Sequence, residues 1–261
     1  MESGFNLAAY LARTGYTGKL DRTAETLRGL HLAHASTIPF ENLDIQMGLP
    51  IHLDEASLQE KLVDRSRGGY CFEQNTLFMA ALRALGFSPK PCEARVRLGN
   101  VVEMPRTHML LLVGVEGVEL LCDVGFRGEG LLHPLPTDGA EHTQFLATYR
   151  IVPEGPLRVL QSLRPEGWLD LYAFVPEARE PIDFEVANWY TSTHPKSRFV
   201  TTLTAQLPTP EARYILRNRT LTTIRESVPE SRELGDTELL ELLGSRFGLA
   251  VAPGTRFRAL E

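Results

Sequence analysis

The strongest constraint on the fold is a change in apolar spacing near residue 90. Before it, apolar residues recur at three- and four-residue intervals, as on a helix face: Leu27 and Leu30 in DRTAETLRGLHLAHAS, Leu58 and Leu62 in DEASLQEKLVD. Asp54 is a candidate cap of the second helix. After it, short segments rich in Val and Leu are separated by Gly, Pro and acidic turns; they are PCEARVRLG, THMLLLVGV, VELLCDVGF, PLRVLQS and WLDLYAFV. These segments predict an antiparallel sheet or barrel.

The last third of the chain, from about Asn188, mixes both kinds of element. FVTTLTAQL and RYILRNRTLTTIRE indicate strands, and DTELLELLGSRFG indicates a closing helix capped by Asp236 or Thr237. Between the early helices, we expect IPFENLD and QMGLPIHLD to form loops and short extended pieces. We find no internal repeat and no low-complexity linker. Helices, then strands, then a mixed tail is typical of an α+β fold with segregated layers.

Composition narrows the class of protein. The 261 residues suffice for a substantial core, and the net charge of −6 does not fit a nucleic-acid-binding face. No apolar run reaches about 18 residues, and the first residues lack the pattern of a signal peptide, so we expect no membrane segment. The three widely spaced cysteines include no C-x-x-C pair, which argues against a disulfide framework and a zinc site. We therefore expect a soluble cytoplasmic protein with reduced thiols and no bound metal.

The segment RGGYCFEQN places Cys71 at the start of a predicted helix that stops near Gly86. A helix N-terminus presents unpaired N–H groups and a positive dipole end, and both favour thiolate over thiol. Such sites, with a protonated histidine nearby, lower the pKa of a thiol from about 8.5 to roughly 3.5–7.5. The two glycines before Tyr70 would let a substrate reach the sulfur. The alternative is a small buried side chain, which is how we interpret Cys92 and Cys122.

A nucleophilic cysteine needs a base, and His108 is the best placed of the seven histidines. It opens the apolar strand THMLLLVGV, where a polar side chain should face a cleft or have a buried partner. We expect the other six to be structural or surface residues; they are His31, His34, His52, His133, His142 and His194.

The register of a predicted hairpin supplies the partner of His108. In VGVEGVEL, Glu116 and Gly117 are expected to be the two central residues of a tight turn. Continued along both strands, this register puts His108 opposite Gly125 and puts Asp123 on the same face, diagonal to the histidine. Diagonal neighbours lie about 7–8 Å apart between Cα atoms, within reach of a His–Asp hydrogen bond. A buried carboxylate inside LLCDVGF would be costly without such a partner.

Three segments together resemble the signatures of the arylamine N-acetyltransferases. RGGYCFEQN, THMLLLV and CDVGF occur in the order and spacing of that family, and YLARTGYTG, IPFENLD and NWYTSTHPKSRF extend the resemblance over most of the chain. The resemblance implies that Cys71, His108 and Asp123 form a catalytic triad. It also implies that Cys71 accepts an acetyl group from acetyl-CoA, a co-substrate and not a permanently bound cofactor. An arylamine or hydrazine would then remove the acetyl group in a ping-pong cycle.

The same resemblance implies the architecture. A helical bundle over residues 1–88 would carry the cysteine, a β-barrel over residues 89–188 would carry the histidine and aspartate, and an α/β lid would cover residues 189–261. The core would be similar to that of the cysteine proteases. Glu41 and Arg67 would form an ion pair that braces the active-site loop; the alternative is ordinary surface charge, which contributes little.

Further residues match the substrate-binding regions of the family. Phe40, Phe126 and Phe199 match its apolar acceptor pocket, with simple core packing as the alternative for Phe40. Thr107 and the backbone of Gly125–Gly128 match the region that meets the pantetheine arm and the acyl oxygen.

One position departs from the family pattern. Arg127 follows VGF where the family usually has glycine, and a long cation there would either close the pocket to bulky amines or attract the phosphates of CoA. The chain has no P-loop or Rossmann glycine pattern, so those devices do not hold the nucleotide. Lys196, Arg198 and Arg127 are the candidates for phosphate contacts on this acidic chain.

Three other functions use the same residues. One is a related acyltransferase that closes an amide on a carrier-bound chain, which would need a different pocket size around Phe126 and Phe199. Another is a cysteine hydrolase, which would consume acetyl-CoA without an acceptor. The third is a non-catalytic binding module, against which an intact triad argues. The sequence leaves open the acceptor amine, the acyl group and the oligomeric state, a homo-oligomer included.

Overall fold

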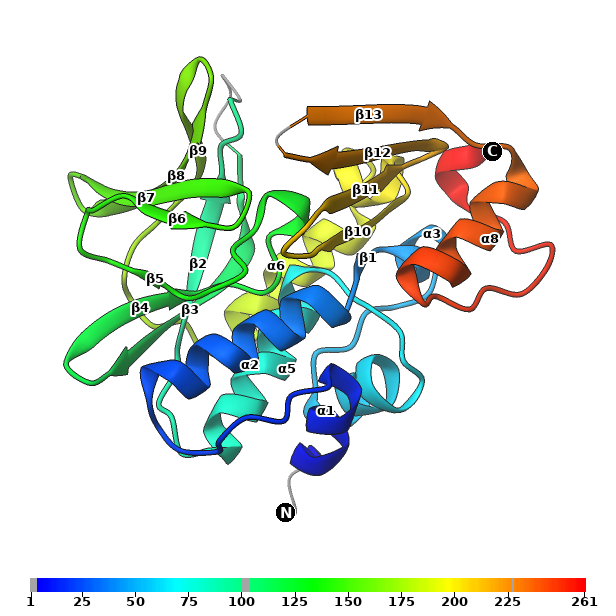
Figure 1. The fold of residues 1–261 in the computed structure, drawn as a ribbon. Coiled ribbons are helices and arrows are strands. Elements are labelled where there is room, and N and C mark those ends of the chain that lie inside the picture. The colour runs from blue at the N-terminus through cyan, green and yellow to red at the C-terminus, as the bar shows by residue number, and fades with distance from the viewer. Residues whose placement is uncertain (1–3, 100–103, 227) are drawn as a thin grey trace.

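Helices fill the first third of the chain and strands the middle, as the change in apolar spacing predicts (Figure 1). The computed structural model describes residues 4–99, 104–226 and 228–261, and for Arg127 the backbone alone. The α-helices are α1 (Leu7–Thr14), α2 (Ala24–Thr37), α3 (Leu43–Gln46), α4 (Glu55–Leu58), α5 (Cys71–Ala84), α6 (Pro181–Thr193), α7 (Arg198–Thr201) and α8 (Asp236–Phe247). A π-helical segment, η1 (Gln59–Asp64), follows α4, and two short 3₁₀ turns are η2 (Arg127–Glu129) and η3 (Arg258–Leu260).

The middle of the chain forms an eight-stranded antiparallel sheet in the order β5-β4-β3-β2-β9-β8-β7-β6. Its strands are β2 (Lys90–Val96), β3 (Arg106–Val115), β4 (Val118–Cys122), β5 (Leu135–Pro136), β6 (His142–Gln144), β7 (Ala147–Glu154), β8 (Leu157–Arg164) and β9 (Gly167–Phe174). The edge strand β5 also contacts β7, so the sheet curls into a nearly closed barrel. The fold class is therefore α+β, as predicted.

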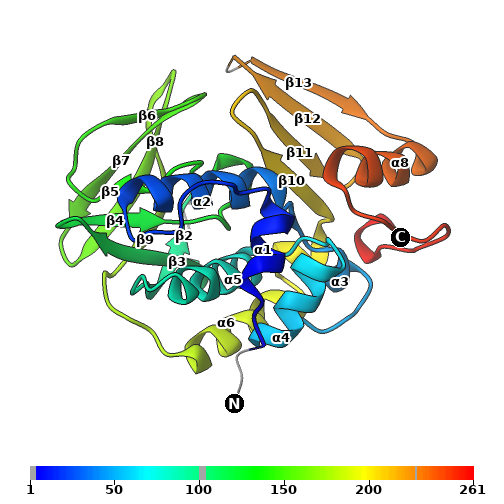
Figure 2. The same cartoon turned by 60° about the horizontal axis from the view of Figure 1, so that its bottom comes forward.

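A second sheet pairs one strand of the helical third with four strands from the last third of the chain. Its order is β1-β10-β11-β12-β13, and all four pairings are antiparallel. The strands are β1 (Phe40–Glu41), β10 (Thr204–Pro208), β11 (Arg213–Arg217), β12 (Thr220–Arg225) and β13 (Val228–Glu233). Figure 2 shows α8 against this sheet, on the side of the molecule away from the barrel. Because β1 comes from the helical third, its pairing with β10 connects the C-terminal sheet to that part of the chain.

Local signals explain where several helices begin and end. Asn6, Thr23 and Asp54 cap α1, α2 and α4, and each side chain accepts a backbone N–H from the first turn. The cap predicted for Asp54 is thus confirmed. Gly86, in the left-handed region at φ +83°, follows the end of α5 at the predicted stop.

Three hydrophobic cores hold these layers together. One lies among the helices and the helix-facing side of β3, and it includes Cys71 and Cys122. The second fills the barrel and includes Cys92 and Phe126. The third lies between the C-terminal sheet and α8. None of the described helices is long and apolar enough to cross a membrane.

Several predicted elements differ from those observed. The helix predicted over DEASLQEKLVD changes to π-helical geometry at Gln59, and IPFENLD contains β1 and the first two residues of the short helix α3. The strand predicted over FVTTLTAQL begins with the helical turn α7, so only its second half is β10. α8 begins at Asp236, with Gly235 in the cap position predicted for Asp236 or Thr237.

Helix α6 was not predicted, because its apolar spacing does not mark its buried side. The buried residues are Phe184, Ala187, Asn188 and Thr191, whereas Ile182, Val186 and Trp189 are exposed. The boundary expected between residues 188 and 189 falls inside this helix, and the division into three domains stays a prediction.

Candidate active site

Cys71 is the first residue of α5 and is 3 % exposed. The turn before it passes tightly beneath β1, because the Glu41 N–H donates to the Gly69 carbonyl over 3.0 Å. A Cβ on Gly68 would lie 2.1 Å from the Pro39 carbonyl oxygen, so only glycine fits this approach. At the helix start, the Glu73 carboxylate accepts the Tyr70 N–H over 3.0 Å. The glycines and this cap together place the sulfur at the N-terminus of a rigid helix.

The predicted hairpin places His108 and Asp123 together. β3 pairs with β4 in the predicted register, with Val115 opposite Val118 and a turn at Glu116 and Gly117, both at positive φ. His108 Nε2 lies 2.7 Å from Asp123 Oδ2, and both side chains are buried. The other side of the imidazole faces the cysteine, whose Sγ lies 3.6 Å from the Thr107 carbonyl oxygen.

The Asp123 carboxylate is surrounded by donors. Tyr172 Oη donates to Oδ2 over 2.9 Å, while Asn75 Nδ2 and the Gly125 N–H each donate to Oδ1 over 3.0 Å. The Asp123 N–H donates to His31 Nε2 over 3.1 Å. A carboxylate with this many donors stays ionised although it is buried.

These contacts set the charges of the pair. Burial opposes a positive charge on His108, but the Asp123 carboxylate and hydrogen bonds with Asp123 and Cys71 outweigh it and raise the pKa of His108 to about 9. Burial likewise opposes ionisation of Asp123, but His108, Asn75 and the Gly125 N–H hold the pKa of Asp123 below its usual value. At neutral pH the site therefore holds an imidazolium against a carboxylate, with the sulfur of Cys71 beside them.

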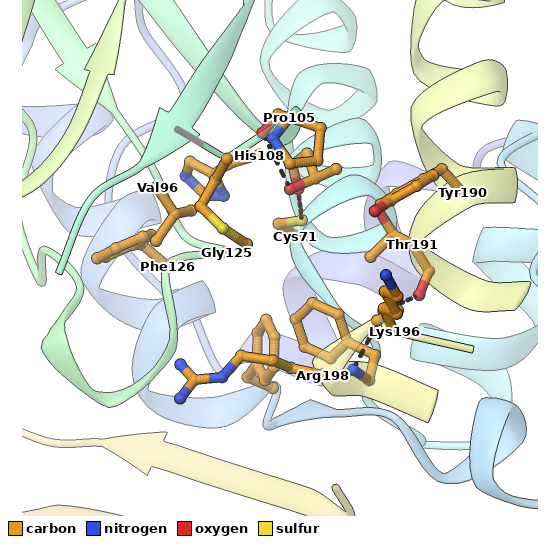
Figure 3. Close-up of a pocket in the computed structure, with 15 residues that line it drawn as sticks. Cys71, Val96, Pro105, His108, Gly125, Phe126, Tyr190, Thr191, Lys196 and Arg198 are labelled. Atoms are coloured by element: carbon orange, nitrogen blue, oxygen red, sulfur yellow. Dashed lines mark hydrogen bonds between the residues drawn. The ribbon is translucent and has the colours of Figure 1, made fainter. Parts of the chain in front are cut away.

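A pocket opens onto the sulfur (Figure 3). The empty space in it, counted out to its open mouth, is about 710 Å³. Its lining includes Cys71, His108 and most of the substrate-binding residues expected from the sequence: Phe40, Thr107, Gly125, Phe126 and Phe199. Gly128 does not line it; the Gly128 N–H donates to Gln206 Oε1 of β10 over 2.7 Å.

A buried charge network lies beneath the active-site loop. Arg67 Nη2 lies 2.8 Å from Glu41 Oε1 and 3.0 Å from Asp44 Oδ1. Lys61 Nζ lies 2.6 Å from both Asp44 Oδ2 and Glu73 Oε1. The Glu41–Arg67 pair expected from the sequence is thus part of a five-residue network, and ordinary surface charge does not describe it.

Comparison with known proteins decides the family. A family model described as N-acetyltransferase matches residues 23–256. An arylamine N-acetyltransferase of Mycobacterium tuberculosis is 40% identical to this chain and covers 98% of it and 93% of its own length. The Escherichia coli arylamine N-acetyltransferase is 42% identical over 73% of this chain and 68% of its own length. The chain belongs to the arylamine N-acetyltransferase family.

Solved structures of the family share the fold. The M. tuberculosis arylamine N-acetyltransferase superposes with a TM-score of 0.92 at 40% identity, and 98% of each chain is covered. The Mycobacterium marinum enzyme, solved in complex with CoA, gives a TM-score of 0.89 at 38% identity over 94% of this chain and 93% of its own. This chain is accordingly an acetyltransferase with a barrel and a cysteine-protease-like core.

Sequence reasoning missed Asn75, Tyr172 and His31, which surround Asp123. Asn75 had a local signal, because it lies one helical turn after Cys71 on the same face of α5. Tyr172 and His31 reach Asp123 from β9 and α2, and no local pattern links them to it. The side chain of Arg127 lies outside the described part of the structure.

The other two cysteines are buried away from the pocket. Burial raises the pKa of Cys92 to about 11, and it raises the pKa of Cys122 well above its ordinary value. Both thiols are therefore protonated at neutral pH, which leaves Cys71 as the thiol at the pocket.

Proposed function

We propose that this arylamine N-acetyltransferase carries the acetyl group on Cys71 as a thioester. The donor is acetyl-CoA, the acceptor is a small aromatic amine or hydrazine, and the cycle is ping-pong. The supporting observation is the placement of Cys71 at the start of α5, in one pocket with His108, whose Nε2 lies 2.7 Å from Asp123. This is the arrangement of nucleophile, base and orienting carboxylate that acyl transfer through a thiol requires.

The first half-reaction begins from a thiolate–imidazolium pair. The thiolate of Cys71 attacks the carbonyl carbon of the acetyl thioester, and the bond from that carbon to the CoA sulfur breaks. His108 gives its proton to the departing CoA thiolate, which leaves neutral imidazole and acetyl-Cys71. Because one thioester replaces another, the step is nearly balanced in free energy. The first-turn N–H groups of α5 would stabilise the negative charge on the acyl oxygen.

The second half-reaction restores the pair. The amine nitrogen attacks the acetyl carbon, and neutral His108 removes a proton from that nitrogen. The bond to the Cys71 sulfur then breaks, which releases the amide and returns thiolate and imidazolium. Asp123 keeps the ring oriented in both steps. Formation of an amide from a thioester runs downhill and makes this half-reaction the driving step.

The test is an intact-mass spectrum after brief exposure to acetyl-CoA, followed by an arylamine chase. We expect one acetyl group on the wild type, none on Cys71→Ala, and its removal as acetylated amine. Loss of the acetyl group to water at the same rate without amine would make the protein a hydrolase. Absence of both acetylation and CoA release would overturn acetyl-CoA as the donor.

We also propose that the reaction takes place in the cytoplasm. The three cysteines are free in the structure, and the cytoplasm keeps thiols reduced, whereas oxidising compartments favour disulfides.

A further inference from the structure

Helix α6 carries an apolar stripe on its solvent side. Ile182, Val186 and Trp189 are 61%, 64% and 66% exposed, and the exposed Thr193 continues the line. Steps of four, three and four residues put these side chains on one side of a helix. Single exposed apolar residues are common, whereas a contiguous stripe with a tryptophan in it is typical of an interaction surface. We call these four residues the α6 stripe.

The opposite side of α6 is fixed to the active site. Phe184 belongs to the core among the helices, and Asn188 Oδ1 accepts a hydrogen bond from Tyr70 Oη. Tyr190 and Thr191 line the active-site pocket (Figure 3). Figure 2 shows α6 at the lower edge of the molecule. The helix therefore presents the α6 stripe in one orientation, so a partner would lose little free energy in ordering it.

The α6 stripe has the spacing of a coiled-coil contact. Alternating steps of four and three residues are those between the d and a positions of a heptad repeat. Ile182 and Trp189 occupy d positions, and Val186 and Thr193 occupy a positions. Residues at a and d pack against the a and d residues of a second helix. The spacing therefore favours a helix as the partner.

Carboxylates flank the α6 stripe on both sides. Asp183 and Glu185 occupy the e and g positions, where charges select the partner of a coiled coil. Helix α6 contains no lysine or arginine. Arg179 precedes the helix, but its Nε lies 3.2 Å from Glu93 Oε2 and its Nη1 lies 3.3 Å from Glu177 Oε2. Because the charge of Arg179 is already paired, the flanks of the stripe are negative.

This charge pattern distinguishes among possible partners. Two copies of the chain paired along the stripe would bring carboxylates to both flanks, and like charges oppose such pairing. Helices that lie on a membrane surface carry Lys and Arg beside their apolar face, and α6 has the opposite charge. A helix with Lys or Arg at its own e and g positions would complement Asp183 and Glu185 with ion pairs.

We propose that the α6 stripe docks a basic amphipathic helix of another protein. The apolar residues of that helix would pack on the stripe, and its lysines or arginines would pair with Asp183 and Glu185. Because Thr191 of the same helix lines the active-site pocket, the partner would lie beside that pocket. Docking needs no acetyl transfer, so its test is independent of the proposed function.

The probe is a synthetic helix of about three heptads with leucine at a and d and lysine at e and g. A matched peptide carries glutamate at e and g. Fluorescence anisotropy of the labelled peptides, measured without acetyl-CoA, should show the lysine peptide bound at least about tenfold more tightly by the wild type. Trp189→Ser should weaken binding of the lysine peptide about tenfold. Glu185→Lys should reverse the preference, so that the glutamate peptide is bound more tightly.

Two variants outside α6 control for net charge and for exposed apolar area. Glu241→Lys makes the same charge change at an exposed position of α8, and Leu20→Ser removes an apolar side chain that is 51% exposed. Both should bind the lysine peptide as tightly as the wild type does. If they weaken binding as much as the variants of α6, the overall charge of the chain holds the peptide and the proposal is wrong.

Two further measurements test the other partners. Sedimentation velocity of concentrated protein should give the same oligomeric state for the wild type and Trp189→Ser. A dimer that Trp189→Ser dissociates would mean that a second copy covers the stripe. Co-sedimentation with vesicles of phosphatidylcholine and phosphatidylserine should show no binding that depends on Trp189. Such binding would make the stripe a membrane contact, and either result would overturn the proposal.

Discussion

The hydroxyl of Tyr172 donates a 2.9 Å hydrogen bond to Asp123 Oδ2, the same oxygen that faces His108. Tyr172 lies on β9, which only β2 separates from β3 in the sheet, and it is fully buried. The barrel therefore supplies an orienting group for the carboxylate as well as the strand that carries the histidine.

We expect Tyr172→Phe to slow acetylation of Cys71 about tenfold in a single turnover, because the carboxylate loses a donor that holds it toward His108. Tyr10→Phe is a matched control, since Tyr10 is equally buried and its hydroxyl bonds His34 over 2.9 Å among the helices. Each substitution should lower the free energy of unfolding by about 0.5–1.5 kcal/mol. If both variants acetylate at the same rate, Tyr172 contributes to stability alone.

The histidines should titrate in widely separated ranges. His108 has a pKa raised to about 9, whereas burial lowers the pKa of His31 to about 4 and that of His34 to about 3. In an NMR titration between pH 5 and 10, only His108 of these three should change its charge. A midpoint for His108 near 6.5 would contradict the ion pair with Asp123.

The raised pKa of His108 also predicts how stability depends on pH. The contribution of His108 to the free energy of unfolding is fully present below about pH 6.5, the pKa of a histidine in the unfolded chain. This contribution is lost as the pH rises through 9, because the folded state then gives up the extra proton. The difference in free energy of unfolding between the wild type and His108→Gln, measured in urea, should shrink by roughly 3 kcal/mol between pH 6 and pH 10. A difference that stays constant over this range would show that the imidazolium is not stabilised in the folded protein.

The His108–Asp123 pair could be predicted because it depends on one short hairpin. A two-residue turn at Glu116 and Gly117 fixes the register, and strand periodicity then places every side chain up to the site. Cys71 was recognisable for a similar reason, since glycines and a helix start are local signals. Its assignment to the same site came from the family resemblance.

The rest of the site depends on contacts between distant segments. β1 pairs with β10 although more than half the chain separates them, and Tyr172 meets Asp123 only once the barrel curls. Helix α6 could not be predicted from apolar spacing, because the apolar residues Ile182, Val186 and Trp189 lie on its exposed side. Pro181 at its first position was the available signal of a helix start.

The charge network beneath the loop should be sensitive to loss of its lysine. Lys61 is 7% exposed and contacts Asp44 and Glu73, so Lys61→Met leaves the buried carboxylate of Glu73 without this cation and leaves Asp44 with Arg67. We expect the free energy of unfolding to fall by about 3–5 kcal/mol in urea titrations. Arg65→Met is the control on the same helical turn, because Arg65 pairs with Glu60 at the surface over 3.7 Å. Its effect should stay below about 1 kcal/mol, and a similar loss in both variants would show that burial of the network is unimportant.

Gly125 should not tolerate a side chain, because it lies against the start of α5. A Cβ there would lie 2.8 Å from Cys71 Cα and 2.7 Å from Asn75 Nδ2, which holds Asp123. Cys71 Cα belongs to the backbone, and Asn75 Nδ2 is held by hydrogen bonds to the Met109 carbonyl and Asp123 Oδ1, so Gly125→Ala must move the loop or the helix that carries the nucleophile. A displacement of about 1 Å at reacting atoms slows a reaction roughly a hundredfold, and we expect that loss in the acetylation rate of Cys71.

The matched control for Gly125→Ala is Gly114→Ala on β3. A Cβ at Gly114 meets nothing within 4 Å, so this variant should acetylate at the wild-type rate and unfold within about 0.5 kcal/mol of it. Rapid acetylation of both variants would mean that the loop after Asp123 can move away from α5 without cost. The close approach of Gly125 would then not be what positions the sulfur against His108.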